Sequence, residues 1–400
     1  MEKSVGGRFL VGAILWAVFA TGCGGGGSGG STGTPGSQST PSSAHGTADC
    51  ATGNASFSVT PLALSNVVGW VPLGAMEPSG HTFPTDHQYL YFATPGSASV
   101  SVPVVAPSDM RIWMIYQTMG IEPEFSIWMQ PCAQIIGRLG SITALSSDLA
   151  AAAGSINQNC QTSPGTTNSQ CQAELQYDVK AGQVIGTISS TTAYALDWWL
   201  WDSRVAPIHF TDPGKFTGGP EPNFTEANIV PASAYYTAAL TAQVAAKLGS
   251  FDGTQQRTTA PVGGTIQVDV DGTARGYWFN SAQAYPPETY QAALAPDNVQ
   301  PTTTQVISLG LSQPNPGVFR ASFAPVTTGQ VNRAFEAVTA DGNVYCYQGV
   351  AENTGGQTRV ALLQLLDANT LKIEVLASSI SSCAGAQPWT FSSSAVTYKR

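Results

Sequence analysis

Charge is what this sequence has least of. Charged residues make up 10% of its 400 positions, with 16 Lys and Arg against 25 Asp and Glu, and the basic residues form no cluster. The formal net charge is −9. Because nucleic acids and anionic membrane surfaces are bound by basic patches, an acidic chain without one is a poor partner for either. We therefore expect no nucleic-acid partner.

The patterns of two common functional sites are also missing. There is no Cys-x-x-Cys pair, which argues against a cysteine metal cluster, and Gly263-Gly264 carries no phosphate-loop pattern. In place of long polar helices, the chain is rich in Gly, Ser, Thr, Ala and Pro, a composition typical of short strands joined by turns. The sequence therefore predicts a mainly β protein.

The first 22 residues have the pattern of a signal peptide. Lys3 and Arg8 accompany an apolar run, Phe9–Ala20, which is too short to span a bilayer. The run ends in Ala20-Thr21-Gly22-Cys23, which resembles the cleavage box of bacterial lipoproteins. This resemblance implies that Cys23 is lipidated on its sulfur and becomes the new N-terminus. The alternative is an ordinary secretory signal with an incidental cysteine.

A lipidated Cys23 would anchor the exported protein to the bacterial cell envelope, at the outer membrane or the cell surface, with the membrane as a partner. Residues 23–54, which follow, are rich in Gly, Ser and Thr. They offer few apolar side chains to bury, so we expect a flexible tether. His45 lies in this tether, and we assign it no role.

Six further cysteines predict disulfides, because an even number in an exported chain is typical of oxidised pairs. Cys160 with Cys171 is the firmest pair, since the segment between them is short, polar and rich in turn residues. Closing a loop of that size restricts the unfolded chain by roughly 3 kcal/mol. Cys346 with Cys383 would staple the C-terminal domain, which leaves Cys50 with Cys132.

Two β domains are expected after the tether. Residues 55–212 contain short apolar runs separated by Pro and Gly, which predict strands, and one helix over Ser141–Ala153. Residues 213–257 predict a linker with a second helix over Ala232–Leu248. One face of that helix should pack on a flanking domain, through Tyr236, Leu240, Val244 and Leu248.

Residues 258–400 predict a C-terminal β domain. About eight strand-like segments without a long helix favour a small antiparallel barrel or sandwich. The segments are Thr265–Val270, Gly276–Phe279, Thr304–Leu309, Val318–Phe323, Asn343–Tyr347, Arg359–Leu366, Thr370–Leu376 and Trp389–Tyr398.

Potential ligands and acid/base groups are densest in Gly80–His87. Two of the four histidines, His81 and His87, lie there with Asp86 between them. These residue types can hold a metal ion or move a proton. The alternative is a turn, because Thr-Phe-Pro-Thr-Asp is good turn chemistry and Asp86 can accept from nearby backbone amides.

Two later segments resemble the lysostaphin-like (M23) metallopeptidases. Val102–Met110, which reads Val-Pro-Val-Val-Ala-Pro-Ser-Asp-Met, is similar to a strand-turn-strand of that family, and Tyr177–Gly186 is similar to its Val-Lys-x-Gly-Gln-x-Ile-Gly turn. The second pattern needs Gly182 for a tight turn. The resemblance covers residues 80–203 and implies that the first domain is a duplicated-hybrid-motif β-sandwich.

The same resemblance implies a zinc site. Its ligands in this chain would be His81, Asp86 and Asp197, all of acceptable ligand types. The match is incomplete, because four residues separate His81 from Asp86 where the family has three. The His-x-His pair of the family and its further His are also missing. Without those imidazoles, the activation of water is unaccounted for.

Three functions therefore stand open. The preferred one is a cell-envelope lipoprotein whose peptidase-like domain is degenerate, has no catalytic residues or cofactor, and acts in binding or envelope structure. The second is a zinc-dependent peptidase or amidase that acts on cell-wall peptide. The third is a carbohydrate-binding surface lipoprotein in which Trp198, Trp199 and Trp201 stack on sugars; the alternative for these residues is a strand buried on both faces.

The lipid anchor is tested by the substitution Cys23→Ala. This change removes the sulfur that would carry the acyl chains, so we expect the protein to partition into the aqueous phase of a detergent extract. Each buried methylene contributes about 0.8 kcal/mol to membrane binding, so loss of the chains should abolish anchoring. Continued partitioning of the Cys23→Ala protein into detergent would contradict the lipoprotein interpretation.

Overall fold

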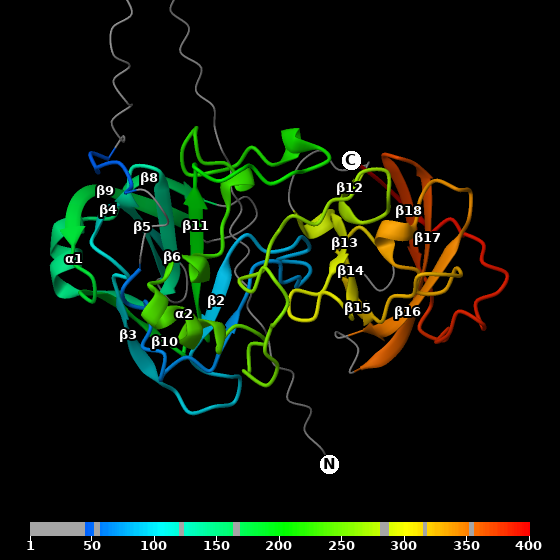
Figure 1. Cartoon of the computed structure of the whole chain (residues 1–400), viewed down its shortest axis with the longest axis horizontal. Coiled ribbons are helices and arrows are strands. Elements are labelled where there is room, and N and C mark those ends of the chain that lie inside the picture. Colours follow the sequence, from blue (N-terminus) through cyan, green and yellow to red (C-terminus); the bar gives the residue numbers. More distant parts are fainter. Residues whose placement is uncertain are drawn as a thin grey trace, which may run out of the picture.

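A computed structural model describes residues 45–51, 57–119, 124–162, 169–280, 288–314, 318–351 and 356–400. Two β lobes lie side by side, one mostly of cyan and green strands and one of yellow to red strands (Figure 1). The prediction of a mainly β protein is confirmed. Cys23 and the signal peptide lie outside the described residues, and none of the described helices is both long and apolar enough to cross a membrane.

The first lobe, called the sheet lobe, is built on one large antiparallel sheet and one small one. The large sheet has the strand order β1 (Gly69–Val71), β2 (Gln88–Tyr91), β11 (Ala195–Asp202), β6 (Ile135–Ile142), β5 (Glu124–Cys132), β4 (Met110–Met119), β9 (Ser169–Val179) and β8 (Gln158–Thr162). The small sheet consists of β3 (Ser101–Val105), β10 (Val184–Ser189) and β7 (Ala144–Leu145).

Strand β11 is buried on both of its faces. Trp198 lies on one face, in the core that the large sheet shares with β3 and β10, and it is 1% exposed. Trp199 and Trp201 lie on the other face and are 7% and 3% exposed. The interpretation as a strand buried on both faces is confirmed, and the interpretation of these three residues as a sugar-stacking surface is wrong.

The two segments that resemble the M23 family form neighbouring turns. Ala106 N donates to Gln183 O at 2.9 Å, and Gly182 N donates to Ala106 O at 2.9 Å. Gly182 has φ +81°, a backbone conformation that side chains with a Cβ rarely adopt. The predicted need for glycine at this turn is therefore confirmed.

The second lobe, called the barrel lobe, is a closed eight-stranded barrel. Each strand pairs antiparallel with the next in sequence, and the first pairs with the last. The strands are β12 (Gly276–Asn280), β13 (Ala292–Pro296), β14 (Gln305–Leu309), β15 (Phe319–Phe323), β16 (Tyr345–Ala351), β17 (Gln357–Asp367), β18 (Thr370–Val375) and β19 (Val396–Lys399). The expectation of a small antiparallel barrel is met.

Two predicted strands of this lobe are wrong or too long. Residues 265–270 form no strand, because the Asp269 carboxylate takes the Thr211 and Tyr277 amides that a strand partner would otherwise use. The apolar side chains of that segment, Ile266 and Val268, are buried between the lobes. The last strand begins at Val396, not at Trp389.

The predicted helices are shorter in the structure. Helix α1 spans Ser147–Ala153, because the residues before it continue β6 and form β7, and the Ser146 side chain caps it by accepting from Leu149 N. The linker helix divides into η3 (Ala232–Tyr235) and α2 (Ala238–Ala245). The remaining short helices are η1 (Pro213–Lys215), η2 (Glu226–Asn228), η4 (Glu288–Tyr290) and η5 (Phe335–Ala337).

The linker packs on the sheet lobe. Tyr236, Val244 and Leu248 are buried in the core of that lobe and Leu240 packs against it, which confirms the expectation for this apolar face. The end of the predicted tether also packs there. His45 stacks on Trp113 with ring centroids 4.0 Å apart, so it has a packing role that the sequence did not indicate.

Three disulfides are present, and all three predicted pairings are confirmed: Cys50–Cys132, Cys160–Cys171 and Cys346–Cys383. The first joins the end of the tether to β5, the second joins β8 to β9, and the third ties the barrel to its C-terminal segment. Disulfides persist in oxidising compartments, so the three bonds are compatible with an exported protein.

An apolar core joins the two lobes; we call it the interlobe core. On the sheet side it contains Trp199 and Trp201, and on the barrel side Tyr277 and Phe279, which point out of the barrel. Phe83, from the loop before β2, lies between the lobes, with its ring centroid 5.0 Å from that of Tyr277 and 5.3 Å from that of Phe279. The segment that carries His81 and Asp86 is therefore held against both lobes.

The importance of this contact is tested by the substitution Phe83→Ala. Phe83 is 8% exposed, so truncation leaves a cavity in the interlobe core, and we expect the free energy of unfolding to fall by about 3 kcal/mol. Urea denaturation followed by tryptophan fluorescence measures this loss. The control is Phe251→Ala, which removes a ring that is 46% exposed and should cost only about 0.5 kcal/mol. Equal losses in the two variants would show that Phe83 does not hold the lobes together.

Candidate functional site

The His81 segment is a tight turn fixed to the barrel. Glu77 N donates to His81 O at 2.7 Å and His81 N donates to Glu77 O at 2.9 Å, so the two side chains stand beside each other. Phe83 N donates to the Glu288 carboxylate at 3.3 Å, and Arg320 Nε donates to Met76 O at 2.7 Å. Both partners, Glu288 and Arg320, come from the barrel lobe. The turn is thus positioned by both lobes.

Asp86 is engaged by two side chains of the sheet lobe. Its Oδ1 lies 2.7 Å from His87 Nδ1 and accepts from Trp199 Nε1 at 2.9 Å. Burial raises the pKa of Asp86, but the hydrogen bonds from His87 and Trp199 outweigh it and hold the pKa below its usual range. The His87 ring packs on Trp199 at a centroid distance of 3.9 Å, and its side chain is only 4% exposed.

Asp197 and Glu124 share one hydroxyl. Ser141 Oγ lies 2.8 Å from Asp197 Oδ2 and 3.3 Å from Glu124 Oε1. Ser141 reaches this face through a β-bulge, because β6 has two residues, Gly140 and Ser141, where β5 has one. Ser141 takes φ +61°, in the left-handed region, at this bulge.

Gly140 leaves the space that these side chains occupy. A Cβ at this position would lie 3.0 Å from Trp199 Cζ3 and 3.3 Å from Asp197 Oδ2. Arg138, two residues earlier on the same face, is buried and places its guanidinium carbon 4.1 Å from the Trp199 ring centroid. Its positive charge therefore lies beneath the carboxylates, within the protein.

A chain of aromatic rings continues from His81 across the sheet margin. Ring centroids lie 6.3 Å apart for His81 and Tyr89, 6.2 Å for Tyr89 and Tyr91, and 5.6 Å for Tyr91 and Phe251. We call these four rings the aromatic cage. Tyr89 lies directly opposite Asp197 in the β2–β11 pairing, so the cage and Asp197 are on the same face of the sheet.

Phe251 reaches the cage because Gly69 has no side chain. Gly69 lies opposite Tyr91 in the β1–β2 pair. A Cβ on Gly69 would lie 2.2 Å from Ser250 O and 2.7 Å from Phe251 O, so any other residue would push this turn away from β1. The sequence signal for this contact is a single glycine at a strand edge, which by itself does not indicate a ring contact.

The cage lies in the field of carboxylates. Burial raises the pKa of Glu124 and Asp197 above the usual range of carboxyl groups. Burial, with the charges of Asp197 and Glu77 next, also raises the pKa of Tyr89 well above its ordinary value. Burial, together with the charge of His87, lowers the pKa of His81 to about 4, so the His81 imidazole is neutral at pH 7.

The zinc site that the sequence predicts would be formed by His81, Asp86 and Asp197. Zinc requires three donor atoms that converge to about 2.0–2.2 Å from one point. Asp86 Oδ1 already accepts from Trp199, and Asp197 Oδ2 already accepts from Ser141. In the part of the chain that the structure describes, no group of three or more His, Cys, Asp or Glu side chains could hold a metal ion.

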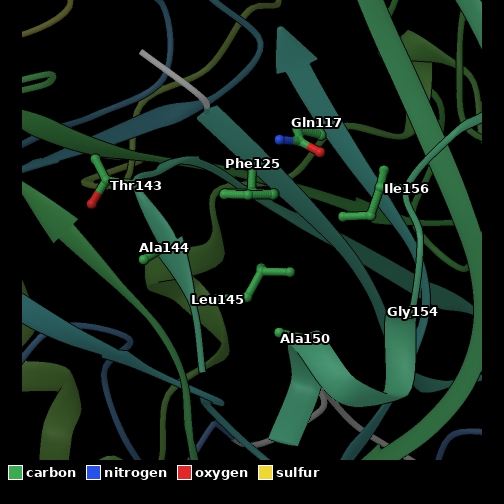
Figure 2. A pocket seen from close by; sticks show the side chains of 8 residues that line it. All are labelled: Gln117, Phe125, Thr143, Ala144, Leu145, Ala150, Gly154 and Ile156. Atoms are coloured by element: carbon green, nitrogen blue, oxygen red, sulfur yellow. The ribbon is translucent and has the colours of Figure 1, made fainter. Parts of the chain in front are cut away.

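A separate hollow of about 280 Å³ lies beside helix α1 (Figure 2). Its lining residues carry no ionisable side chain and are Gln117, Phe125, Thr143, Ala144, Leu145, Ala150, Gly154 and Ile156. Phe125 and Glu124 are neighbours on β5 and therefore face opposite sides of the sheet. The hollow is thus separate from the aromatic cage, and its lining provides no acid or base group.

Sequence analysis found His81, His87, Asp86 and Asp197 but missed the residues beside them. The positions of Tyr89 and Tyr91 could have been found, because they alternate with Leu90 and therefore lie on one face of a strand. The sequence predicts Ser141 in a helix, so it gives no indication that Ser141 approaches Asp197.

Comparison with models of known protein families, with curated proteins and with solved structures finds no match to this chain.

The contact of Glu288 with the loop before β2 makes stability depend on pH. Burial, with the charge of Asp86, raises the pKa of Glu288 from 4.5 to about 8. Between these values the folded protein keeps a proton that the unfolded chain has released, so stability is lost as the pH rises. We expect Glu288→Gln, which keeps the shape and an acceptor, to raise the melting temperature relative to wild type, increasingly from about pH 5 to about pH 8.5.

Differential scanning calorimetry across that pH range measures the difference in melting temperature. The matched control is Glu174→Gln, at an exposed position on β9, which should give the same melting temperature as wild type at every pH. A Glu288→Gln effect that shrinks as the pH rises would contradict the assignment.

Proposed function

We propose that this protein is an exported, lipid-anchored protein of the bacterial cell envelope that binds a ligand at the aromatic cage and performs no hydrolysis. The observation that carries the proposal is the contrast within the site. Asp86 and Asp197 are held by protein side chains, whereas the hydroxyls of Tyr89 and Tyr91 have no hydrogen-bond partner among the described residues. A binding site needs polar groups that the protein leaves available to a ligand, and the two tyrosine hydroxyls meet that need.

The export half of the proposal rests on sequence. The signal-peptide pattern, Cys23 and the glycine-rich segment after it support lipid anchoring, and the three disulfides are compatible with export. The M23 resemblance remains a proposal for the ancestry of the sheet lobe. The strand-turn-strand segments around Ala106 and Gly182 support it. It implies that this lobe keeps the scaffold of the family but lacks the family's His-x-His pair and further His.

The alternative, a zinc-dependent peptidase or amidase, is separated from this proposal by metal analysis. Protein purified without chelator is analysed for zinc, alongside His81→Ala. We expect no stoichiometric zinc in either protein, because the described residues bring no three such ligand side chains together. The control variant is His209→Ala, which removes a histidine paired with Asp271 elsewhere in the chain. Stoichiometric zinc that is lost in His81→Ala and kept in His209→Ala would overturn the non-hydrolytic proposal.

A further inference from the structure

We propose that the aromatic cage binds an organic ammonium ion, with the rings of Tyr89, Tyr91 and Phe251 around the cation and the carboxylates of Glu77 and Asp197 beside it. This inference rests on the proposed binding function and names its ligand class. The shared chemistry is a positively charged nitrogen on a small apolar body, carried either by a quaternary headgroup or by a primary amine of a peptide.

The arrangement of the rings favours a cation over a flat ligand. The planes of Phe251 and Tyr91 are inclined by 55°, those of Tyr91 and Tyr89 by 53°, and those of Tyr89 and His81 by 67°. Rings at such angles present their faces from several directions. A cation gains from each face, because the ring quadrupole is negative there, whereas a sugar ring stacks on one flat platform.

The cage is accessible to a ligand. Phe251 is 46% exposed, and Tyr89, Tyr91 and His81 are half-buried. Among the described residues, the structure gives no hydrogen bond to the side chains of Tyr89, Tyr91, His81 or Glu77. A ligand can therefore touch these groups without displacing a protein contact.

The local charge is negative where the ligand would sit. Glu77 is exposed, and Asp197 and Glu124 are half-buried on the same face. The basic groups that face the cage have other partners: Arg138 is buried under Trp199, and Arg320 donates to Met76 O. His87, whose ring centroid lies 4.6 Å from that of Tyr89, is paired with Asp86. The His81 ring is neutral at pH 7 because burial, with the charge of His87, lowers its pKa to about 4. An incoming ammonium ion would therefore be attracted to the carboxylates and relieve their mutual repulsion.

The test compares choline with 3,3-dimethylbutan-1-ol, which has the same shape without the charge. Titrations use the full-length protein in a polyoxyethylene detergent, which contains neither a cation nor a sugar, and isothermal calorimetry as the readout. We expect choline to bind about tenfold more tightly than the neutral alcohol, or better. A third titration with n-butylamine distinguishes a primary amine from a quaternary headgroup as the natural source.

Variants locate the binding. Tyr91→Ala and Phe251→Ala should each weaken choline binding by about two- to fivefold, which corresponds to roughly 0.5–1 kcal/mol for one ring. Glu77→Gln should weaken the binding of choline and of n-butylamine and leave the binding of the neutral alcohol unchanged. The controls are Phe391→Ala, a partly buried ring beside the Cys346–Cys383 bond, and Glu174→Gln on β9; both should bind as wild type.

The outcomes that overturn the inference are distinct from those that overturn the proposed function. Equal binding of choline and 3,3-dimethylbutan-1-ol, or no binding of either cation, removes the ammonium assignment. Binding of a neutral oligosaccharide such as chitotriose, lost in Tyr91→Ala, would make the cage a sugar site and keep the binding function. The lipid anchor and the absence of hydrolysis are tested by Cys23→Ala and by zinc analysis, and neither depends on the choline result.

Discussion

The burial of β11 on both faces is the constraint on which the molecule depends. On one face, Trp198 packs into the core between the large and the small sheet. On the other, Trp199 and Trp201 share one apolar core with the outward-pointing rings of Tyr277 and Phe279 on β12. Burying each of these large rings stabilises the fold by about 2–3 kcal/mol through the hydrophobic effect. One strand therefore stabilises the sheet lobe and also its attachment to the barrel.

The same constraint determines what the polar groups of that face can do. Trp199 is buried between the lobes, and its indole N–H donates to Asp86, which satisfies this buried donor. His87 packs on the same ring and contacts the same carboxylate. Residues that looked like ligands in the sequence therefore stabilise the loop before β2, while the neighbouring tyrosines of β2 remain available at the margin of the sheet.

Much of the fold could be predicted from local pattern. Most strand-length apolar runs, the turn at Gly182 and the Cys160–Cys171 pair follow from composition, period and short-range spacing, and the structure contains them. The misses share a cause. The Ala-rich run that ends at Ala153 predicts a helix from Ser141. Ile142 pairs with β5, and Ala144 and Leu145 pair with β10, so sheet pairing outweighs that local preference. Residues 265–270 alternate as a strand does, but the Asp269 side chain, not the backbone of this segment, accepts from the amides of Thr211 and Tyr277.

The sequence by itself determined the mainly β class and the pairing of six of the seven cysteines, and it predicts an export signal, a lipidation site and a tether. It also identified His81, Asp86 and Asp197 as chemically important. Only the tertiary structure decided their partners, since Asp86 contacts Trp199 across 113 positions and Ser141 approaches Asp197 across 56. Contacts at such separations follow from strand order, a bulge and the absence of side chains at Gly69 and Gly140, none of which a local pattern specifies.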